Sequence, residues 1–332
     1  MSDLYVWDEE GEFRVQDLAA REAAPEAAAH VQSIRAGQSP PQPSGDAGQE
    51  WPPRLPRWLK RNVPKGNANH FTSRLVQDLQ LATVCEHARC PNRMECYAQK
   101  TATFMILGQV CTRRCRFCSV RKGKPSPVDA DEPRRVAEAA VKLGLRHVVI
   151  TCVTRDDLPD GGAEHFVRTI EAIRAVSDAT IEVLPSDFAG NGQAVDRLVA
   201  ARPEVYNHNS ETVPRLFREV RARKASWSWT LAMFRRIKAG NAAIRTKTGL
   251  MLGLGETREE LLAALDDLAS ARVEMLTLGQ YLQPSPAQMP VVRYVPPDEF
   301  AELAELASGL GFQQVAAGPF VRSSYHARGM LT

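Results

Sequence analysis

The sequence predicts an α/β protein built on a parallel sheet, either doubly wound or closed into part or all of a barrel. Strand-like and helix-like runs alternate through some six to seven units from about residue 101 onward, and no two strand runs follow one another directly. Such alternation gives parallel strands joined by right-handed helical crossovers. At 332 residues the chain is long enough for one large domain of this class with extensions, or for two ordinary domains.

The expected elements follow in order from residue 101. The apolar run 101–110 is typical of a buried strand and ends at a cysteine triplet. A helix then follows a cap at Asp129 or Asp131 and stops at Gly144. The later strands are expected at 146–151, 180–185, 204–209, 243–253, 274–282 and 312–318. The later helices are expected through 165–176, 194–202, 231–240, 259–271 and 299–311.

The first 52 residues differ in composition from the rest of the chain. AAREAAPEAAAH favours a short helix broken near Pro25, and QSPPQPSGDAGQEWPP has almost nothing to bury. We therefore expect residues 1–52 to be a disordered extension. The acidic start MSDLYVWDEEGEF is neither a secretory nor a mitochondrial-type signal, and no apolar run approaches the roughly 18 residues of a membrane helix. We expect a cytoplasmic protein without a membrane partner.

The charge balance does not favour a nucleic-acid partner. Lys and Arg number 42 against 39 Asp and Glu, which gives a net charge of +3. That excess is too small to predict binding to a polyanion. Two basic runs, 54–61 and 113–124, are expected to form local patches.

Six of the seven cysteines fall in two tight triplets, the first spaced C-x4-C-x5-C and the second C-x3-C-x2-C. The members are Cys85, Cys90, Cys96, Cys111, Cys115 and Cys118. Clustered cysteines in a reducing compartment favour metal ligation over disulfides. A closed structural metal site normally uses four ligands, and neither triplet has a fourth cysteine nearby. Two sites that are each one ligand short indicate two iron–sulfur clusters, each with an iron free for another ligand.

The second triplet directly follows the first strand, at the sheet edge where parallel α/β folds carry their chemistry. Three thiolates on one loop can hold three irons of a 4Fe–4S cube, and the fourth iron can be chelated by S-adenosylmethionine. A zinc site is the alternative for either triplet, and His87 is a candidate to complete the first one. A zinc- or iron-binding interaction protein without catalysis therefore stays open at this point.

A dense set of motifs runs from about Arg57 to Ala327. It includes TVCEHARCPNRMEC, TATFMILGQVCTRRCRFC, VTRDDLPDGGAEHF, NHNSETVPRL, GLMLGLGET, LTLGQYLQPS, MPVVRYV and VRSSYHA. In these motifs the chain resembles the radical S-adenosylmethionine superfamily, and within it the lipoyl synthase family. The resemblance implies a partial (β/α)6-type TIM barrel of the radical S-adenosylmethionine kind over residues 101–318. It also implies an N-terminal extension at 53–100 and a C-terminal segment at 319–332, which together carry an auxiliary cluster.

The resemblance assigns the two triplets to different clusters. The second triplet would hold the radical-generating 4Fe–4S cluster, and Phe117 would shield it and contact adenine. The first triplet would hold the auxiliary 4Fe–4S cluster, whose fourth ligand in this family is a serine of the RSSY motif, here residues 322–325. We favour Ser324 over Ser323. A serine oxygen is a hard, poor ligand for iron beside thiolates, which suits a cluster that is taken apart.

By the same resemblance, Asn209 and Glu211 would hold the ribose and the amino group of S-adenosylmethionine, and Arg221 its carboxylate. A capped helix start followed by an exposed charge run is the plainer interpretation of these residues. The stretch VRARKASWSWTLAMF lacks the Pro-Gly of the family pattern, so Arg223 or Lys224 can replace Arg221 in this role.

The implied reaction inserts two sulfur atoms at carbons 6 and 8 of an octanoyl group on a lysine of a lipoyl carrier domain. Two molecules of S-adenosylmethionine are cleaved in turn, each adenosyl radical removes one hydrogen, and each carbon radical attacks a sulfide of the auxiliary cluster. The implied partners are carrier domains of 2-oxo-acid dehydrogenase acyltransferase subunits and of glycine cleavage H protein, a flavodoxin- or ferredoxin-type reductant, and an iron–sulfur carrier protein. Another radical sulfur-inserting enzyme or a methylthiotransferase is the alternative, which the RSSY motif disfavours.

For three further features the sequence predicts a general structural role only. Arg155, Asp156 and Asp157 are expected to form a strand-end loop that shapes the pocket. GLMLGLGE is expected to be a strand end and turn, because no Lys-Ser/Thr follows as in a phosphate loop. Cys152 receives no role, because a lone buried cysteine usually packs as a small hydrophobic side chain.

Overall fold

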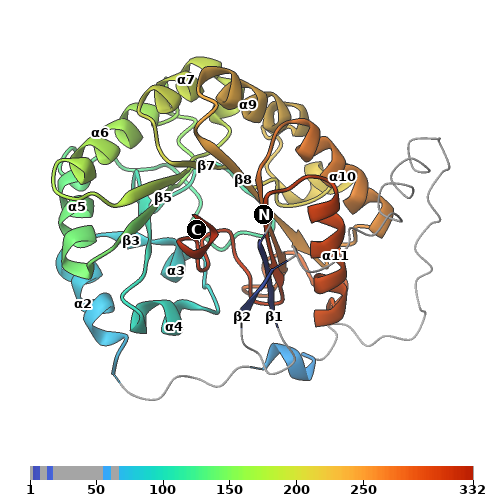
Figure 1. Ribbon diagram of the computed structural model, residues 1–332. Coiled ribbons are helices and arrows are strands. Elements are labelled where there is room, and N and C mark those ends of the chain that lie inside the picture. Colours follow the sequence, from blue (N-terminus) through green and yellow to red (C-terminus); the bar gives the residue numbers. More distant parts are fainter. Residues whose placement is uncertain (1–2, 8–12, 18–54, 61–66, 332) are drawn as a thin grey trace.

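The computed structural model describes residues 3–7, 13–17, 55–60 and 67–331. Figure 1 shows an arc of strands with helices along its outer side, as the alternation in the sequence predicts. The successive parallel strands are β4 (Thr103–Ile106), β5 (His147–Cys152), β6 (Thr180–Leu184), β7 (Val205–Asn207), β8 (Arg245–Leu252), β9 (Met275–Gln280) and β10 (Gln314–Gly318). The helices between them are α5 (Glu132–Leu143), α6 (Ala163–Arg174), α7 (Gly192–Ala200), α8 (Phe217–Val220), α9 (Trp227–Gly240), α10 (Arg258–Ser270) and α11 (Pro297–Gly309).

The strands of the described residues form one sheet in the order β2-β1-β10-β9-β8-β7-β6-β5-β4-β3. From β4 to β10 every neighbouring pair is parallel and follows chain order. Six β/α units therefore run from β4 to α11, and β10 follows them. Because the two ends of the sheet, β2 and β3, do not pair with each other, the barrel is partial and open, as expected.

Residues that the sequence marks as helix starts and stops lie at the ends of helices in the structure. α5 begins directly after Asp131 and ends at Gly144, whose φ of 67° is the left-handed conformation that glycine adopts easily. Asp131 does not cap the helix with its side chain and instead pairs with Arg134 on the exposed face. α10 starts with a complete capping box, in which Thr257 and Glu260 each bond the other's backbone.

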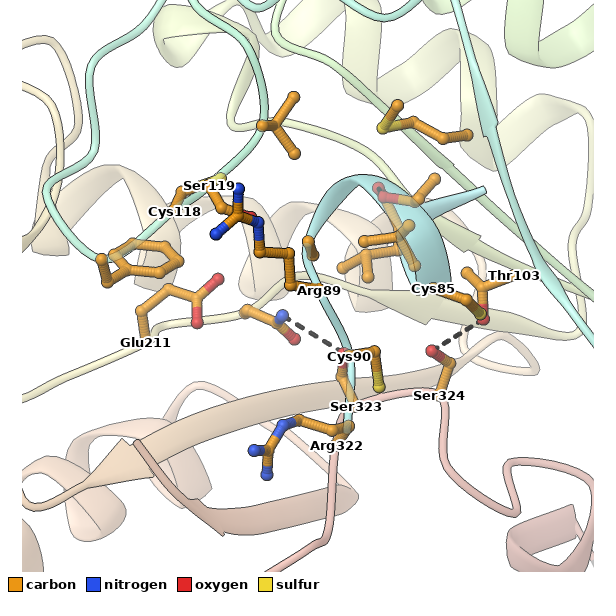
Figure 2. A pocket seen from close by; sticks show the side chains of 18 of the residues that line it. Cys85, Arg89, Cys90, Thr103, Cys118, Ser119, Glu211, Arg322, Ser323 and Ser324 are labelled. Carbon is orange, nitrogen blue, oxygen red and sulfur yellow. Dashed lines mark hydrogen bonds between the residues drawn. The ribbon is translucent and has the colours of Figure 1, made fainter. Parts of the chain in front are cut away.

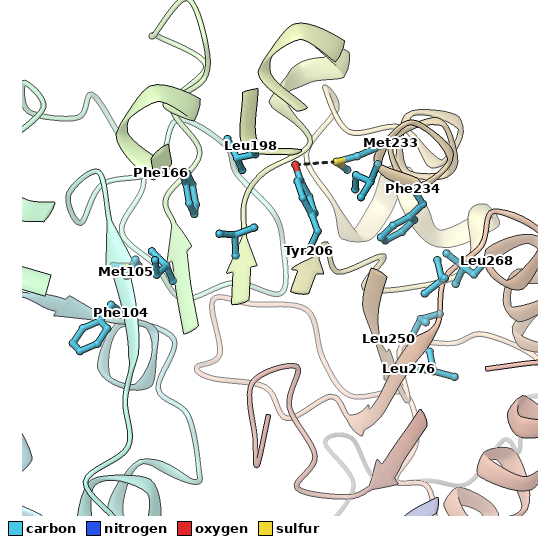
Figure 3. Packing of buried hydrophobic residues seen from close by; sticks show 14 of the residues in the cluster. Phe104, Met105, Phe166, Leu198, Tyr206, Met233, Phe234, Leu250, Leu268 and Leu276 are labelled. Carbon is cyan, nitrogen blue, oxygen red and sulfur yellow. Dashed lines mark hydrogen bonds between the residues drawn. The ribbon is translucent and has the colours of Figure 1, made fainter. Parts of the chain in front are cut away.

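Apolar side chains from the strands and the outer helices form one continuous core (Figure 3). Phe166 on α6 and Leu198 on α7 are fully buried beside the strands. Tyr206 on β7 packs towards α9, where its hydroxyl lies 3.7 Å from the sulfur of Met233. Apolar side chains of the strands pack against the helices, and the sheet also buries an ion pair between Glu182 on β6 and Lys247 on β8. This rigid frame fixes the positions of the loops that follow the strands.

The expectation of disorder through residues 1–52 is wrong for two segments. β1 (Asp3–Trp7) pairs in parallel with β10, with Asp3 opposite Gln314, and β2 (Phe13–Asp17) pairs antiparallel with β1. A strand added at a sheet edge depends on a partner far away in the chain, which the composition of its neighbourhood does not reveal. The expected helix in AAREAAPEAAAH and the expected linker lie outside the described residues.

Residues before and after the barrel meet at its open side. The N-terminal part contains α2 (His70–Asp78), β3 (Ala82–Thr83), α3 (Val84–His87) and α4 (Arg93–Ala98), and β3 pairs antiparallel with β4.

Two hydrogen bonds tie this part to the C-terminal segment. The amide of Asn92 donates to the carbonyl of Phe320 at 2.7 Å, and the hydroxyl of Tyr325 lies 2.8 Å from a carboxylate oxygen of Glu95. Leu59 is buried against Phe320 and Tyr325. The barrel thus brings together two segments from opposite ends of the sequence.

No helix among the described residues is long and apolar enough to cross a membrane.

Candidate active site

A cavity of about 470 Å³ opens where the parallel strands end, at the edge that the sequence predicts for chemistry. Every residue predicted to bind a cluster or S-adenosylmethionine lines it: Cys85, Cys90, Cys96, Cys111, Cys115, Phe117, Cys118, Asn209, Glu211, Arg221 and Ser324. Arg155, Asp156 and Asp157, which we expect to shape the pocket, do not line it. Ser323 and Cys152 line it as well. Figure 2 shows Cys118 and Glu211 on one side of this space and Cys85, Cys90 and Ser324 on another. The two cysteine triplets therefore face a common chamber.

The second triplet lies on a compact loop after β4. The chain turns at Leu107 and Gly108, both of which have positive φ angles. The N–H of Cys111 donates to the carbonyl of Arg121 at 2.8 Å, and the Cys111 carbonyl accepts from the N–H of Gly123 at 3.0 Å. These bonds close the loop on itself, so the three cysteines stay together on a short, ordered segment.

Arg113, between the first two cysteines of this loop, anchors it to the barrel. Its guanidinium donates to both carboxylate oxygens of Asp156 at 2.9 and 2.8 Å and lies 2.7 Å from Asp187. The side chains of Arg113 and Asp187 are only 4% and 1% exposed. Burial alone would raise the pKa of Asp187, but the hydrogen bond and charge of Arg113 outweigh burial and hold it below its usual range. The loop after β4 is thus held by the loops after β5 and β6.

Sequence reasoning did not identify this anchor. The sequence predicts Asp156 only as part of a pocket-shaping loop, and no local pattern distinguishes Arg113 or Asp187. The sequence signal was an arginine inside a cysteine motif and acidic residues after two neighbouring strands. Their pairing could be recognised only once the order of the strands was known.

The first triplet lies on the turns around α3 and α4. The N–H of Cys90 donates to the carbonyl of Cys85 at 3.1 Å, and the N–H of Cys96 donates to the carbonyl of Asn92 at 2.9 Å. Burial raises the pKa of the Cys85 thiol to about 11. Burial likewise raises the pKa of Cys118, in the other triplet, to about 12. Because metal ligation requires thiolates, a bound cation must offset the cost of ionising these buried thiols.

The two serines of the RSSY motif lie in different surroundings. Ser324 accepts a hydrogen bond of 2.9 Å from the hydroxyl of Thr103 on β4, close to Cys85 in Figure 2. Ser323 accepts one of 3.3 Å from the amide of Asn209. The C-terminal segment thus places the Ser324 oxygen, a candidate metal ligand, beside the first triplet, although the two are more than two hundred residues apart in sequence.

Asn209, Glu211 and Arg221 form a polar wall of the cavity after β7. A guanidinium N–H of Arg221 donates to the carbonyl of Asn209 at 2.6 Å. Burial raises the pKa of Glu211, although the charge of Arg221 opposes this shift. Within the described residues, the side-chain oxygen of Asn209 and the Nε of Arg221 are buried without a hydrogen-bond partner.

These unpaired atoms fit a polar ligand, because buried polar atoms are normally satisfied. The amino, carboxylate and ribose hydroxyl groups of S-adenosylmethionine offer suitable partners for them. Arg223 and Lys224, the alternatives to Arg221, do not line the cavity.

The positions of the candidate metal ligands test the alternative that the triplets bind zinc. The Nδ1 of His87 lies 2.9 Å from the carbonyl of Thr83, and His87 does not line the cavity. Across the described residues, no group of three or more His, Cys, Asp or Glu side chains could hold a single metal ion. A zinc ion needs its donors within about 2.0–2.3 Å of one point, whereas a four-iron cluster spreads its ligands over several irons. His87 is therefore not placed to complete the first triplet from the cavity side.

Comparisons with known proteins agree with this geometry. Residues 105–268 match the Radical SAM superfamily, and residues 44–90 match the N-terminal domain of lipoyl synthase of the Radical SAM family. The solved structure of the FeFe-hydrogenase maturase HydG from Carboxydothermus hydrogenoformans is similar in fold, with a TM-score of 0.50 at 18% identity. That similarity covers 76% of this chain and 73% of the maturase.

Curated relatives are much more similar in sequence. The lipoyl synthase of Rhodopirellula baltica is 60% identical over 278 residues, which cover 83% of this chain and 88% of the relative. The lipoyl synthase of Caldanaerobacter subterraneus subsp. tengcongensis is 51% identical over 274 residues, covering 82% and 96% of the two chains. With the two cysteine triplets facing one cavity, the chain belongs to the lipoyl synthase family of radical S-adenosylmethionine enzymes.

Proposed function

We propose that this cavity inserts two sulfur atoms at carbons 6 and 8 of an octanoyl group carried on a lysine of a lipoyl carrier domain. The observation that carries the proposal is that both cysteine triplets and the RSSY serines line the same chamber. A radical generator and a sulfur source can then act on one acyl chain without releasing it. Unactivated C–H bonds are beyond acid–base chemistry, so a cofactor supplies the difficult step and the protein supplies placement.

Cys111, Cys115 and Cys118 are proposed to hold the radical cluster. When bound, this cluster supplies the electron that cleaves S-adenosylmethionine to a 5′-deoxyadenosyl radical. Phe117, half-buried beside the triplet, excludes water from one side and offers a flat apolar surface to adenine.

The polar wall after β7 positions the cosubstrate. Arg221 presents its unpaired Nε to the carboxylate, and Asn209 presents its unpaired oxygen to a hydroxyl or amino group. Glu211 shares the same wall and can accept from the amino group of S-adenosylmethionine. These contacts orient the sulfonium bond before it is cleaved.

Cys85, Cys90, Cys96 and Ser324 are proposed to hold the auxiliary cluster. Ser324 is the weak ligand of this set, since a hard oxygen competes poorly among thiolates. The hydroxyl of Thr103 donates to the Ser324 oxygen, so it can stabilise the negative charge that remains when that oxygen is released. This arrangement suits a cluster that gives up its sulfur.

The substrates are octanoylated lipoyl carrier domains, and we propose acyltransferase subunits of 2-oxo-acid dehydrogenases and the glycine cleavage H protein among them. We further propose a flavodoxin- or ferredoxin-type protein as reductant, an iron–sulfur carrier protein that rebuilds the auxiliary cluster, and the cytoplasm as the location. The reducing cytoplasm suits six thiols that must remain free for metal.

The function is tested with anaerobically reconstituted protein, an octanoyl-lysine peptide, dithionite and S-adenosylmethionine. We expect mass spectrometry to show addition of two sulfur atoms to the peptide, and we expect iron with absorbance near about 400 nm rather than zinc. No gain of sulfur despite two intact clusters would reject the proposal. Zinc without that absorbance would instead support a non-catalytic metal protein.

Replacing Ser324 is expected to affect formation of the lipoyl product but not cleavage of S-adenosylmethionine. Ser324→Ala removes the proposed fourth ligand but leaves the radical-cluster loop intact, so cleavage of S-adenosylmethionine should persist while lipoyl product falls by about 100-fold. Ser323→Ala removes only a hydrogen bond of about 1 kcal/mol from Asn209 and should retain most product. Quantifying 5′-deoxyadenosine and lipoyl peptide in the same reactions checks both expectations. The reverse ranking would transfer the ligand role to Ser323.

A further inference from the structure

The loop that carries the second triplet concentrates positive charge. Residues 111–124 contain six Lys or Arg and no Asp or Glu, so this segment contributes +6 to a chain of net charge +3 and the rest carries −3. Two of the six are used internally: Arg113 by its acidic partners, and Lys122, whose ammonium donates to the carbonyl of Cys115 at 3.1 Å. The other four are exposed: Arg114, Arg116, Arg121 and Lys124.

A second segment adds to this surface. The N–H of Arg116 donates to the carbonyl of Val220 at 2.9 Å, so the residues after α8 lie beside the loop. Arg223 and Lys224 follow there and are exposed. Within the part of the chain that the structure describes, none of these six exposed cations forms an ion pair. We call Arg114, Arg116, Arg121, Lys124, Arg223 and Lys224 the basic face.

The basic face and the cavity use different residues of the cysteine loop. Cys115, Phe117 and Cys118 line the cavity, whereas no member of the basic face does. Arg116, a member of the basic face, lies in the sequence between Cys115 and Phe117, which both line the cavity. A protein bound to the basic face would contact the loop that carries the second triplet through residues that do not line the cavity.

We propose that the basic face binds an acidic redox protein that delivers single electrons to the radical cluster. This inference rests on the proposed function. The transfer moves one electron, so the donor is oxidised by one electron and the cluster reduced by one, with no bond made or broken. A carrier domain fits this face less well, because its octanoyl-lysine arm has to reach the cavity, and no member of the basic face lines the cavity.

Exposed charges such as those of the basic face change mainly the rate at which a partner associates. Complementary patches steer encounter and speed association at low salt. Added salt screens the attraction between charges that lie farther apart than the Debye length, which is roughly 10 Å at 0.1 M salt. Six exposed cations that form no ion pair within the described residues are enough to attract a partner of opposite charge.

The test compares two double variants of the reconstituted enzyme with a matched control. Arg121→Glu with Lys124→Glu reverses charge on the loop, and Arg223→Glu with Lys224→Glu reverses it on the adjoining segment. The control, Arg74→Glu with Arg235→Glu, makes the same change in net charge at exposed positions on α2 and α9. The probe is a reduced acidic flavodoxin, with affinity measured by calorimetry and cluster reduction by stopped-flow absorbance.

We expect both variants of the basic face to bind the flavodoxin about tenfold more weakly at low salt, and the difference to vanish near 0.5 M salt. Cluster reduction by the flavodoxin should slow in parallel, while cleavage of S-adenosylmethionine driven by dithionite should match the parent. The control should bind like the parent.

Three outcomes would overturn the proposal. The first is unchanged affinity in both variants, and the second is equal weakening in the control, which would indicate general charge rather than a docking face. The third is normal flavodoxin binding with a raised KM for an octanoylated carrier domain, which would assign the face to the carrier. If the parent made no lipoyl product with dithionite, the proposed function would fail, but the affinity comparison would still decide on the basic face.

Discussion

Cys115→Ala is expected to abolish cleavage of S-adenosylmethionine, whereas Cys90→Ala should retain cleavage and make no lipoyl product. Cys115 is the middle residue of the triplet that lines the cavity together with Asn209 and Arg221, and we propose that its loss removes the radical generator. Cys90 belongs to the triplet beside Ser324, so by our proposal its loss removes the sulfur source but not the radical. The measurement is 5′-deoxyadenosine and lipoyl peptide in single-turnover reactions with dithionite.

The matched control is Cys152→Ser, since Cys152 lines the same cavity but belongs to neither triplet. This variant should retain both products. Equal loss of cleavage in Cys115→Ala and Cys90→Ala, with normal folding, would show that the two triplets do not divide the reaction in the way proposed.

Arg113→Met is expected to destabilise the fold by about 3–5 kcal/mol, because Asp156 and Asp187 would be left buried without their cation. Urea unfolding monitored by circular dichroism at neutral pH measures this loss. Arg134→Met is the control, since the pair of Arg134 with Asp131 is largely exposed and its removal should change stability little. A small effect at Arg113 would mean that the loop does not depend on this anchor.

The pH dependence provides an independent check on the same anchor. The folded pKa of Asp187 lies below its unfolded value of 3.8, so its ionised form stabilises the protein above that pH and this contribution is lost as pH falls further. In Arg113→Met, burial without the cation would raise the pKa of Asp187. The stability gap between parent and variant should therefore be largest near neutral pH and narrow on acidification. A gap that did not change with pH would exclude Asp187 as the group responsible.

Much of the fold follows from local sequence. The predicted strands and helices from residue 101 onward appear in order, because each depends on signals a few residues apart. Gly144 ends its helix in the left-handed conformation, and the run 101–110 contains the buried strand β4. The spacing of the cysteines likewise places three thiols on one short loop, whatever the rest of the chain does. Local sequence does not predict β1, because this strand forms by pairing with β10 at the far end of the chain.

By itself, then, the sequence determined the alternating α/β architecture, the two cysteine triplets and the family. Only the tertiary structure decided that both triplets share one chamber, that Ser324 lies beside Thr103 near the first triplet, and that Arg113 is held by Asp156 and Asp187. The physical reason is that these contacts join residues tens to hundreds of positions apart. Their distances are set by the order and curvature of the sheet, which no local pattern of side chains encodes.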